Sequence, residues 1–211
     1  VATEAGTDAV PDLDEVIGQR DAVEALIVAA AGGHHLLMSG PPGAGKTMLA
    51  RRLPGILPFL DDDAAIQAAS LRSLAGLPVA GLSRIPPFEA PHHSASVGAL
   101  VGGGSRTARP GAIARASGGV LFLDEAGEFG AHALDALRQP LETGSIEIHR
   151  AGFRAIFPAH FQLVLATNPV SLALMFGSTF LGIGFGALPG LTATLGVALL
   201  TTLTFGISAE M

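Results

Sequence analysis

The sequence has no cysteine, tryptophan or tyrosine, and its only lysine is Lys46. The absence of cysteine excludes disulfides, thiolate metal sites and a cysteine nucleophile. Charged residues make up 14% of the 211 positions, and the formal net charge is −6 with histidine neutral. This balance argues against a generally basic nucleic-acid coat, and the hydrophobic content of 49% argues against disorder.

The charge is unevenly distributed along the chain. Twenty-nine of the thirty charged residues lie between Glu4 and Arg154, whereas residues 155–209 contain none. The mean hydropathy of +0.50 is therefore an average over two unlike segments. A chain of this length suits one or two domains.

Short apolar runs bounded by glycine alternate with helical patterns over the first 169 residues. The patterns predict strands at 35–39, 119–123 and 161–166, and helices at 19–31, 46–53, 61–74 and 131–142. Residues 76–118 are predicted to form loops and short helices, and residues 146–148 and 155–157 a hairpin around Gly152. Strands alternating with helices indicate an α/β fold with a mostly parallel sheet.

A phosphate-binding loop is predicted between the first strand and the second helix. The pattern G-x-x-x-x-G-K-[ST] is met by Gly40, Pro41, Pro42, Gly43, Ala44, Gly45, Lys46 and Thr47. Its glycines let backbone N–H groups surround phosphate oxygens, and the following helix N-terminus adds a favourable dipole. The Lys46 ammonium reaches the β- and γ-phosphates, and the Thr47 hydroxyl is a Mg²⁺ ligand. These residues predict ATP and Mg²⁺ as cofactors.

Two carboxylates follow the second predicted strand, 119–123, as in a Walker B motif. Asp124 is predicted to bind Mg²⁺, and Glu125 to polarise the water that attacks the γ-phosphate. Alone, such a pair more often begins a helix, but beside a phosphate-binding loop the catalytic interpretation is favoured. Asn168 ends the third strand and is predicted to contact the γ-phosphate or the attacking water; an Asn-Pro turn is the alternative.

The pairs His34-His35 and His92-His93 raise the question of a metal site. No cysteine or carboxylate stands at ligand spacing along the sequence, so loop packing and backbone hydrogen bonding are the favoured roles of these histidines.

Longer stretches of the chain resemble the AAA+ ATPases related to magnesium chelatase, especially the ComM/YifB-type bacterial proteins. The matching text spans residues 12–169 and includes Val16-Ile17-Gly18-Gln19, Ala29-Ala30-Ala31-Gly32-Gly33-His34, Ala90-Pro91-His92-His93-Ser94-Ala95-Ser96 and Leu137-Arg138-Gln139-Pro140-Leu141-Glu142. The resemblance implies a truncated αβα AAA+ core that assembles as a ring homo-oligomer with ATP between subunits. It also places Ile17 and Gly18 near the adenine.

The resemblance further implies a DNA branch-migration motor, in which the hairpin from Ser145 to Ala159 faces the ring pore. His149, Arg150 and Arg154 are the cationic candidates on that hairpin, although ordinary solvated charge is the commoner explanation. Metal insertion of the magnesium chelatase type is the competing function, and residues 90–96 favour the ComM type. The arginine finger and the sensor 2 lid of the family do not follow Pro169. We therefore expect this chain to bind nucleotide weakly and to hydrolyse it poorly.

The uncharged stretch 170–209 is broken at Pro189-Gly190 into two halves, each long enough as a helix to cross a bilayer. A membrane hairpin is predicted, with a buried pair of soluble helices as the alternative. Residues 175–211 are similar to the start of TctA-type permeases of tripartite tricarboxylate transporters. The sequence thus predicts a chimeric chain: a cytoplasmic ATPase module, residues 1–169, carrying a segment for membrane association. A membrane-tethered fragment without enzymatic activity is the alternative function.

Overall fold

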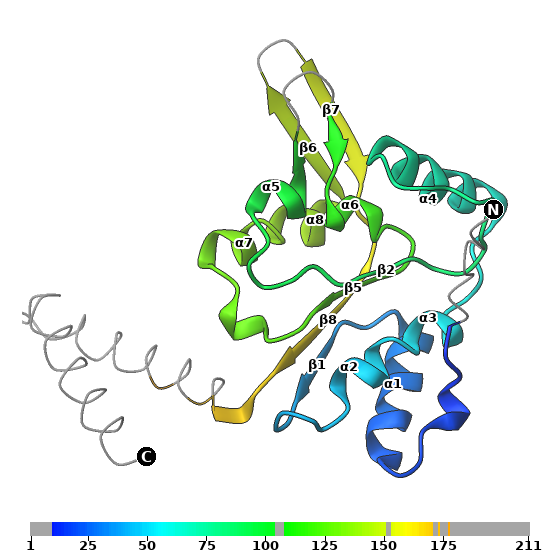
Figure 1. Cartoon of the computed structure of the whole chain (residues 1–211), viewed down its shortest axis with the longest axis vertical. Coiled ribbons are helices and arrows are strands. Elements are labelled where there is room, and N and C mark those ends of the chain that lie inside the picture. Colours follow the sequence, from blue (N-terminus) through cyan, green and yellow to red (C-terminus); the bar gives the residue numbers. More distant parts are fainter. Residues whose placement is uncertain (1–9, 104–107, 151–152, 171–172, 174–176, 178–211) are drawn as a thin grey trace, which may run out of the picture. The chain divides into compact units, whose positions relative to one another are not determined.

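The computed structural model describes residues 10–103, 108–150, 153–170, 173 and 177. The chain divides into two compact units, Val1–Asn168 and Pro169–Met211. Nearly all of the second unit lies outside the described residues, and so does the predicted helix pair broken at Pro189-Gly190. Among the helices that are described, none is long and apolar enough to cross a membrane. The fold below is that of the first unit (Figure 1).

A four-stranded parallel sheet forms the centre of this unit. Its order is β1 (Leu36–Ser39), β8 (Gln162–Thr167), β5 (Val120–Leu123) and β2 (Phe88–Glu89). In the register, Leu36 lies opposite Val164, and Val120 lies opposite Gln162. The three predicted strands and their parallel arrangement are confirmed. Because all strands run the same way, the residues that follow β1, β8 and β5 meet at one edge of the sheet.

Alternate residues of the strands build two separate hydrophobic cores, one on each face of the sheet. Val120 and Phe122 belong to the core that contains Leu26, Ala30, Ala50 and Leu53, whereas Leu121 and Leu123 belong to the core that contains Leu100, Ile113, Ala133 and Leu137. All four residues of β5 are buried, as expected for a strand covered on both faces. The result is an αβα sandwich, as the family resemblance implies.

The helices that supply these cores are short, apart from two of 13 residues. On the side of the first core lie α1 (Arg20–Gly32), α2 (Lys46–Ala50) and α3 (Leu53–Ile56). On the other side lie α4 (Asp62–Leu74), α5 (Val97–Val101), α6 (Ala112–Arg115), α7 (Ala131–Asp135) and α8 (Arg138–Thr143). The 3₁₀ turns η1 (Leu13–Glu15) and η2 (Ala126–Glu128) complete the helical elements described in this first unit.

Two small antiparallel sheets stand apart from the central one. The predicted hairpin is confirmed as β6 (Ser145–Arg150) paired with β7 (Phe153–Pro158), with Ser145 opposite Pro158 (Figure 1). Its strands are longer than predicted because the pairing continues beyond the predicted residues, to Ser145 with Pro158 at one end and Arg150 with Phe153 at the other. Ile146, Ile148 and Phe157 bury their side chains in the second core. The other pair is β3 (Gly102–Gly103) with β4 (Arg109–Pro110).

Two predicted helices have wrong boundaries, and one strand was not predicted. Pro54 does not end the helix at 46–53; α2 ends at Ala50, and Pro54 lies in the first turn of α3, where a missing N–H is harmless. The helix predicted at 131–142 is two helices, because Pro140 has no N–H to donate to the carbonyl of Ala136. The loop region 76–118 also contains β2, which the sequence does not predict.

Candidate functional site

The predicted phosphate-binding loop connects β1 to α2 directly. Gly43 and Gly45 adopt left-handed backbone conformations, with φ of +78° and +79°. The Gly45 carbonyl accepts a hydrogen bond from Leu49 N at 2.9 Å, so this glycine starts the helix. The left-handed backbone at Gly45 favours glycine whatever the space around it, and a Cβ there would also stand 3.3 Å from Met48 Cε. The loop therefore ends with backbone N–H groups directed out of a helix N-terminus.

Lys46, the first residue of α2, is folded back over the loop that precedes it. Its ammonium donates hydrogen bonds to the carbonyl oxygens of Gly40 at 2.7 Å and Pro41 at 3.0 Å. The positive charge is therefore held inside the curve of the loop by neutral acceptors. A phosphate oxygen is a stronger acceptor for such an ammonium than a carbonyl oxygen, because the bond is then between opposite charges.

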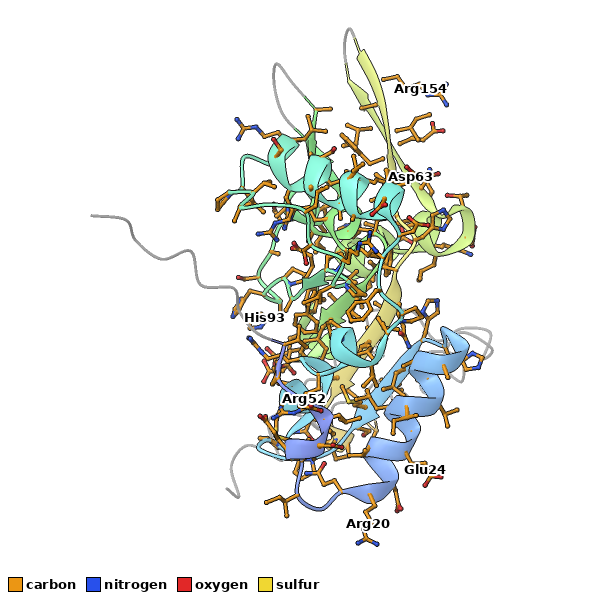
Figure 2. The ribbon with its side chains drawn as sticks, turned by 90° about the vertical axis from the view of Figure 1, so that its right-hand side faces the viewer. Arg20, Glu24, Arg52, Asp63, His93 and Arg154 are labelled. Carbon is orange, nitrogen blue, oxygen red and sulfur yellow. The ribbon has the colours of Figure 1, made fainter. Side chains whose placement is uncertain are left out.

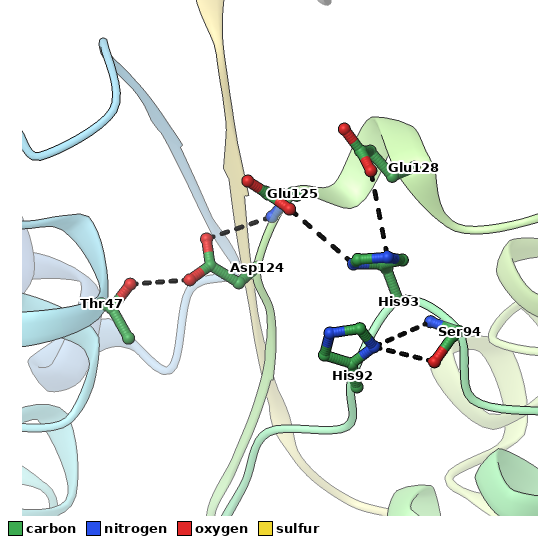
Figure 3. Close-up of polar contacts among 7 residues, drawn as sticks. All are labelled: Thr47, His92, His93, Ser94, Asp124, Glu125 and Glu128. Carbon is green, nitrogen blue, oxygen red and sulfur yellow. Dashed lines mark hydrogen bonds and ion pairs between the residues drawn. The ribbon is translucent and has the colours of Figure 1, made fainter.

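Thr47 and Asp124 bring the two predicted motifs together. The Thr47 hydroxyl donates to Asp124 Oδ2 at 2.7 Å, although the two residues are 77 positions apart (Figure 3). Both side chains are half-buried. A hydroxyl and a carboxylate at the rim of a phosphate-binding loop are oxygen ligands of the kind that Mg²⁺ prefers. The pair fits the predicted metal site.

Glu125 lies beside Asp124 but is directed toward a different segment. Its backbone has φ of +51°, which is uncommon for a residue with a side chain. One carboxylate oxygen, Oε2, lies 3.7 Å from Nδ1 of His93, and Nε2 of the same ring lies 4.0 Å from Oε2 of Glu128 (Figure 3). His93 thus stands between two carboxylates, one of which is the predicted catalytic base.

No carboxylate stands at ligand spacing from the histidine pairs along the sequence, but two lie close to His93 in space. His93, Glu125 and Glu128 offer ligand atoms that all lie within 4.8 Å of one another, a group capable of holding a metal ion. The carboxylates come from the segment after β5, more than thirty residues away, so spacing along the chain could not find them. His35 has the expected structural role: its Nδ1 accepts a hydrogen bond from Leu163 N at 3.0 Å.

Asn168 follows β8, the strand between β1 and β5. The carbonyl of the preceding Thr167 accepts a hydrogen bond from Gly40 N at 3.2 Å, which joins the end of β8 to the start of the phosphate-binding loop. Asn168 therefore lies between the segments that carry Lys46 and Asp124, as a γ-phosphate sensor requires. The sensor role itself stays a prediction.

The predicted adenine contacts, Ile17 and Gly18, lie just before α1. Ile17 is 98% exposed, so its apolar side chain is available to a planar base. The next residue, Gln19, donates from Nε2 to the carbonyl of Ala44 at 3.0 Å and so joins this segment to the phosphate-binding loop. Gln19 was missed as a site residue, although it belongs to the stretch Val16-Ile17-Gly18-Gln19.

Of the cationic candidates on the hairpin, Arg154 is described with its side chain, and it is paired. Its guanidinium donates to both carboxylate oxygens of Glu147 at 2.9 Å; Arg154 is labelled on the hairpin in Figure 2. Its side chain is 60% exposed, so the pair faces water. The side chains of His149 and Arg150 lie outside the described part of the structure.

Comparisons with known proteins agree with this geometry. The family described as magnesium chelatase, subunit ChlI, matches residues 12–179. The chain belongs to this family. Its relatives include the competence protein ComM of Haemophilus influenzae, 56% identical over 75% of this chain and 31% of that protein. They also include YifB of Escherichia coli, 50% identical over 75% of this chain and 31% of that protein.

A solved complex of subunits BchI and BchD of magnesium chelatase has the same core. It is similar over 73% of this chain and 53% of that chain, with 25% identity and a TM-score of 0.54. The chain therefore has the parallel α/β core of AAA+ magnesium chelatase subunits, and the resemblance to the ComM/YifB type is confirmed. It spans about a third of the length of the curated relatives it matches. The resemblance to TctA-type permeases receives no support, and the family match extends to residue 179.

Proposed function

We propose that this chain binds Mg-ATP at the loop formed by residues 40–47, as the nucleotide-binding part of a ComM-type AAA+ ATPase. The observation that carries the proposal is the 2.7 Å hydrogen bond between Thr47 and Asp124. It joins the phosphate-binding loop to the carboxylate that follows β5, which is the arrangement needed to hold a metal ion against bound phosphates.

Each side chain then has a definite task. The Lys46 ammonium leaves the carbonyls of Gly40 and Pro41 and binds phosphate oxygens. Thr47 and Asp124 supply the oxygen ligands of Mg²⁺, which when bound neutralises phosphate charge and orients the phosphoryl group. Glu125 orients and deprotonates the attacking water, and this requires its carboxylate to turn from His93 toward the nucleotide.

The rate of hydrolysis depends on what surrounds the γ-phosphate. In other NTPases, an arginine supplied to the transition state contributes about 10³–10⁵ in rate. Several described arginines are already paired with carboxylates: Arg52 with Glu15, Arg84 with Asp62, Arg115 with Glu89 and Arg154 with Glu147. We therefore propose nucleotide binding with slow turnover for this chain by itself, and hydrolysis at AAA+ rates would contradict that part.

The single lysine provides a direct test of the binding site. An amine-reactive reagent has one side-chain target in this protein, so its reaction with Lys46 can be followed by mass spectrometry. We expect Mg-ATP to protect Lys46, with the α-amino group as an internal reference for general reactivity. Unchanged labelling at saturating Mg-ATP would exclude contact between this lysine and the phosphates.

The matching binding experiment uses Lys46→Ala and Lys46→Arg. The loss of one charge-assisted hydrogen bond of about 1.5–3 kcal/mol predicts about 12- to 160-fold weaker Mg-ATP binding by Lys46→Ala. Lys46→Arg keeps the charge and is expected to lose less. Arg51→Ala removes an exposed cation at the end of α2 and is the control, because its affinity should match that of the unaltered protein.

The proposal of a DNA-remodelling rather than a metal-insertion function rests on similarity. The chain is 56% identical to the competence protein ComM but 25% identical to the magnesium chelatase subunit of known structure. If the hairpin contacts DNA, binding in the presence of Mg-ATP should weaken as salt rises, and Glu147→Gln should strengthen it by releasing Arg154. Absence of DNA binding at low salt would favour the metal-insertion function.

A further inference from the structure

Two residues with side chains adopt left-handed conformations in the described part of the chain, and both flank the phosphate-binding loop. They are Gln19, with φ of +53°, and Glu125, with φ of +51°. Such conformations are unfavourable for residues with a Cβ and tend to occur where the surrounding structure needs them. Glu125 already has a role in the proposed hydrolysis, as the base that deprotonates water, whereas Gln19 has none yet.

Gln19 makes one contact with its helix and another with the loop. Its backbone carbonyl accepts from Val23 N at 3.0 Å and so begins α1. Its side chain does not cap that helix; instead, its amide donates to the carbonyl of Ala44 at 3.0 Å. The left-handed backbone allows the residue to serve both elements at once.

The support behind Gln19 is rigid. Helix α1 is anchored by Leu26 and Ala30, which are buried in the same core as Ala50 and Leu53 at the ends of α2 and α3. The side chain therefore extends from a fixed helix start to the last peptide of the loop. The Gln19 amide also lies next to Gly45, because a Cβ built on that glycine would stand 3.4 Å from Nε2 of Gln19.

The hydrogen bond to Ala44 determines where the neighbouring N–H points. In a trans peptide unit the carbonyl of residue 44 and the N–H of residue 45 point in opposite directions, and no cis peptide occurs among the described residues. Because Gln19 binds the carbonyl of Ala44, the N–H of Gly45 is turned to the side away from the Gln19 amide.

We propose that Gln19 is a positioning residue for polyphosphate binding: it holds the Ala44–Gly45 peptide so that the Gly45 N–H faces the phosphates. The proposal rests on the proposed function, because it assigns a role within the same site. Gln19 itself touches no ligand. Its removal should therefore weaken binding through the loop without removing a group that contacts the nucleotide.

The test compares Gln19→Ala, Gln19→Gly and Gln19→Glu with two probes, Mg-ATP and inorganic tripolyphosphate. Loss of one net hydrogen bond corresponds to about 2- to 12-fold in affinity, and we expect this weakening for all three variants and for both probes. Gln19→Glu keeps the shape but places a carboxylate opposite a carbonyl oxygen, so it should not restore binding. Glu24→Ala is the control, because Glu24 lies on the same helix with its side chain directed away from the phosphate-binding loop (Figure 2). Its affinity for both probes should match that of the unaltered protein.

Different results separate the alternatives. If Gln19 served only the adenine side, Mg-ATP binding would weaken while tripolyphosphate binding stayed unchanged, and the proposal would fail. If only its backbone conformation mattered, Gln19→Gly would bind both probes as the unaltered protein does, and the proposal would also fail. If the unaltered protein and Lys46→Ala bound Mg-ATP equally poorly, the proposed function itself would be wrong, which is a distinct outcome.

Discussion

The hydrogen bond between Thr47 and Asp124 gives a quantitative prediction for the protein without nucleotide. A hydrogen bond to a charged group contributes about 1.5–3 kcal/mol, and the half-exposed position of this pair reduces that to about 1–2 kcal/mol. Thr47→Val keeps the shape and the branched Cβ but removes the hydroxyl. Asp124→Ala removes the acceptor. A double-mutant cycle on the free energy of unfolding should give a coupling of about 1–2 kcal/mol.

The cycle isolates this pair even though Asp124 has a second contact. Asp124 Oδ1 accepts from Glu125 N at 3.1 Å, and this contact is lost in both arms that contain Asp124→Ala, so it cancels. For a chain of this size, the change in Thr47→Val corresponds to a midpoint lower by about 2–8 °C. Ser70→Ala removes a hydroxyl that donates to Ile66 O at 2.7 Å on an exposed helix face, and it should change stability by less than about 0.5 kcal/mol.

Mg-ATP should change the outcome of the same cycle. When both oxygens serve the metal, each single substitution removes most of the stabilisation that the ligand gives, which is about 2.7 kcal/mol at a hundredfold excess over Kd. The double substitution should then remove little more than either single one. Two results would refute the reasoning that these two residues form one metal site. One is a coupling below about 0.3 kcal/mol without ligand, and the other is that, with Mg-ATP, the double substitution loses the sum of the stabilisation lost by the two single ones.

Two further predictions compare matched positions. Gly45→Ala should weaken Mg-ATP binding at least about threefold more than Gly43→Ala in a titration, since φ is alike at both positions but a Cβ meets neighbours at 3.3 Å and 3.4 Å only at Gly45. Arg115→Ala should lower the free energy of unfolding by about 2–3 kcal/mol in a denaturant titration, because its 2.7 Å ion pair with Glu89 is largely buried. Arg84→Ala should lower it by less than about 0.5 kcal/mol, because the ion pair of Arg84 with Asp62 is exposed. Equal affinities in the first comparison, or equal stabilities in the second, would contradict these explanations.

The parts of the fold that the sequence predicts are those with local causes. The strand before the phosphate-binding loop, the loop itself and the buried strand before Asp124 each follow from an apolar run and its flanking residues. The hairpin follows from two apolar stretches around a glycine. In these segments, tertiary contacts reinforce what the chain prefers locally.

The parts that the sequence does not predict have causes elsewhere in the chain. Strand β2 has two residues, and it is held by the side-chain pair of Glu89 with Arg115 and by the backbone contact of Val120 N with Pro87 O at 2.8 Å. The contact of His93 with Glu125 joins a loop after β2 to one after β5. Neither has a periodic signal, because both depend on which strands become neighbours.

The order of the strands explains why the site forms at all. Strand β8 lies between β1 and β5, so Asn168 comes between the loop that carries Lys46 and the carboxylate of Asp124, although it is the last of the three along the chain. Each residue of β5 is buried on one face or the other, which leaves the position after the strand as the first that can carry a charge. The same burial that makes this strand easy to predict therefore places its carboxylates at the edge where the phosphate-binding loop begins. The position of the carboxylates at this edge follows from the packing of the sheet, whereas Gln19 and His93, which contact Ala44 and Glu125, come from the segments that close around it.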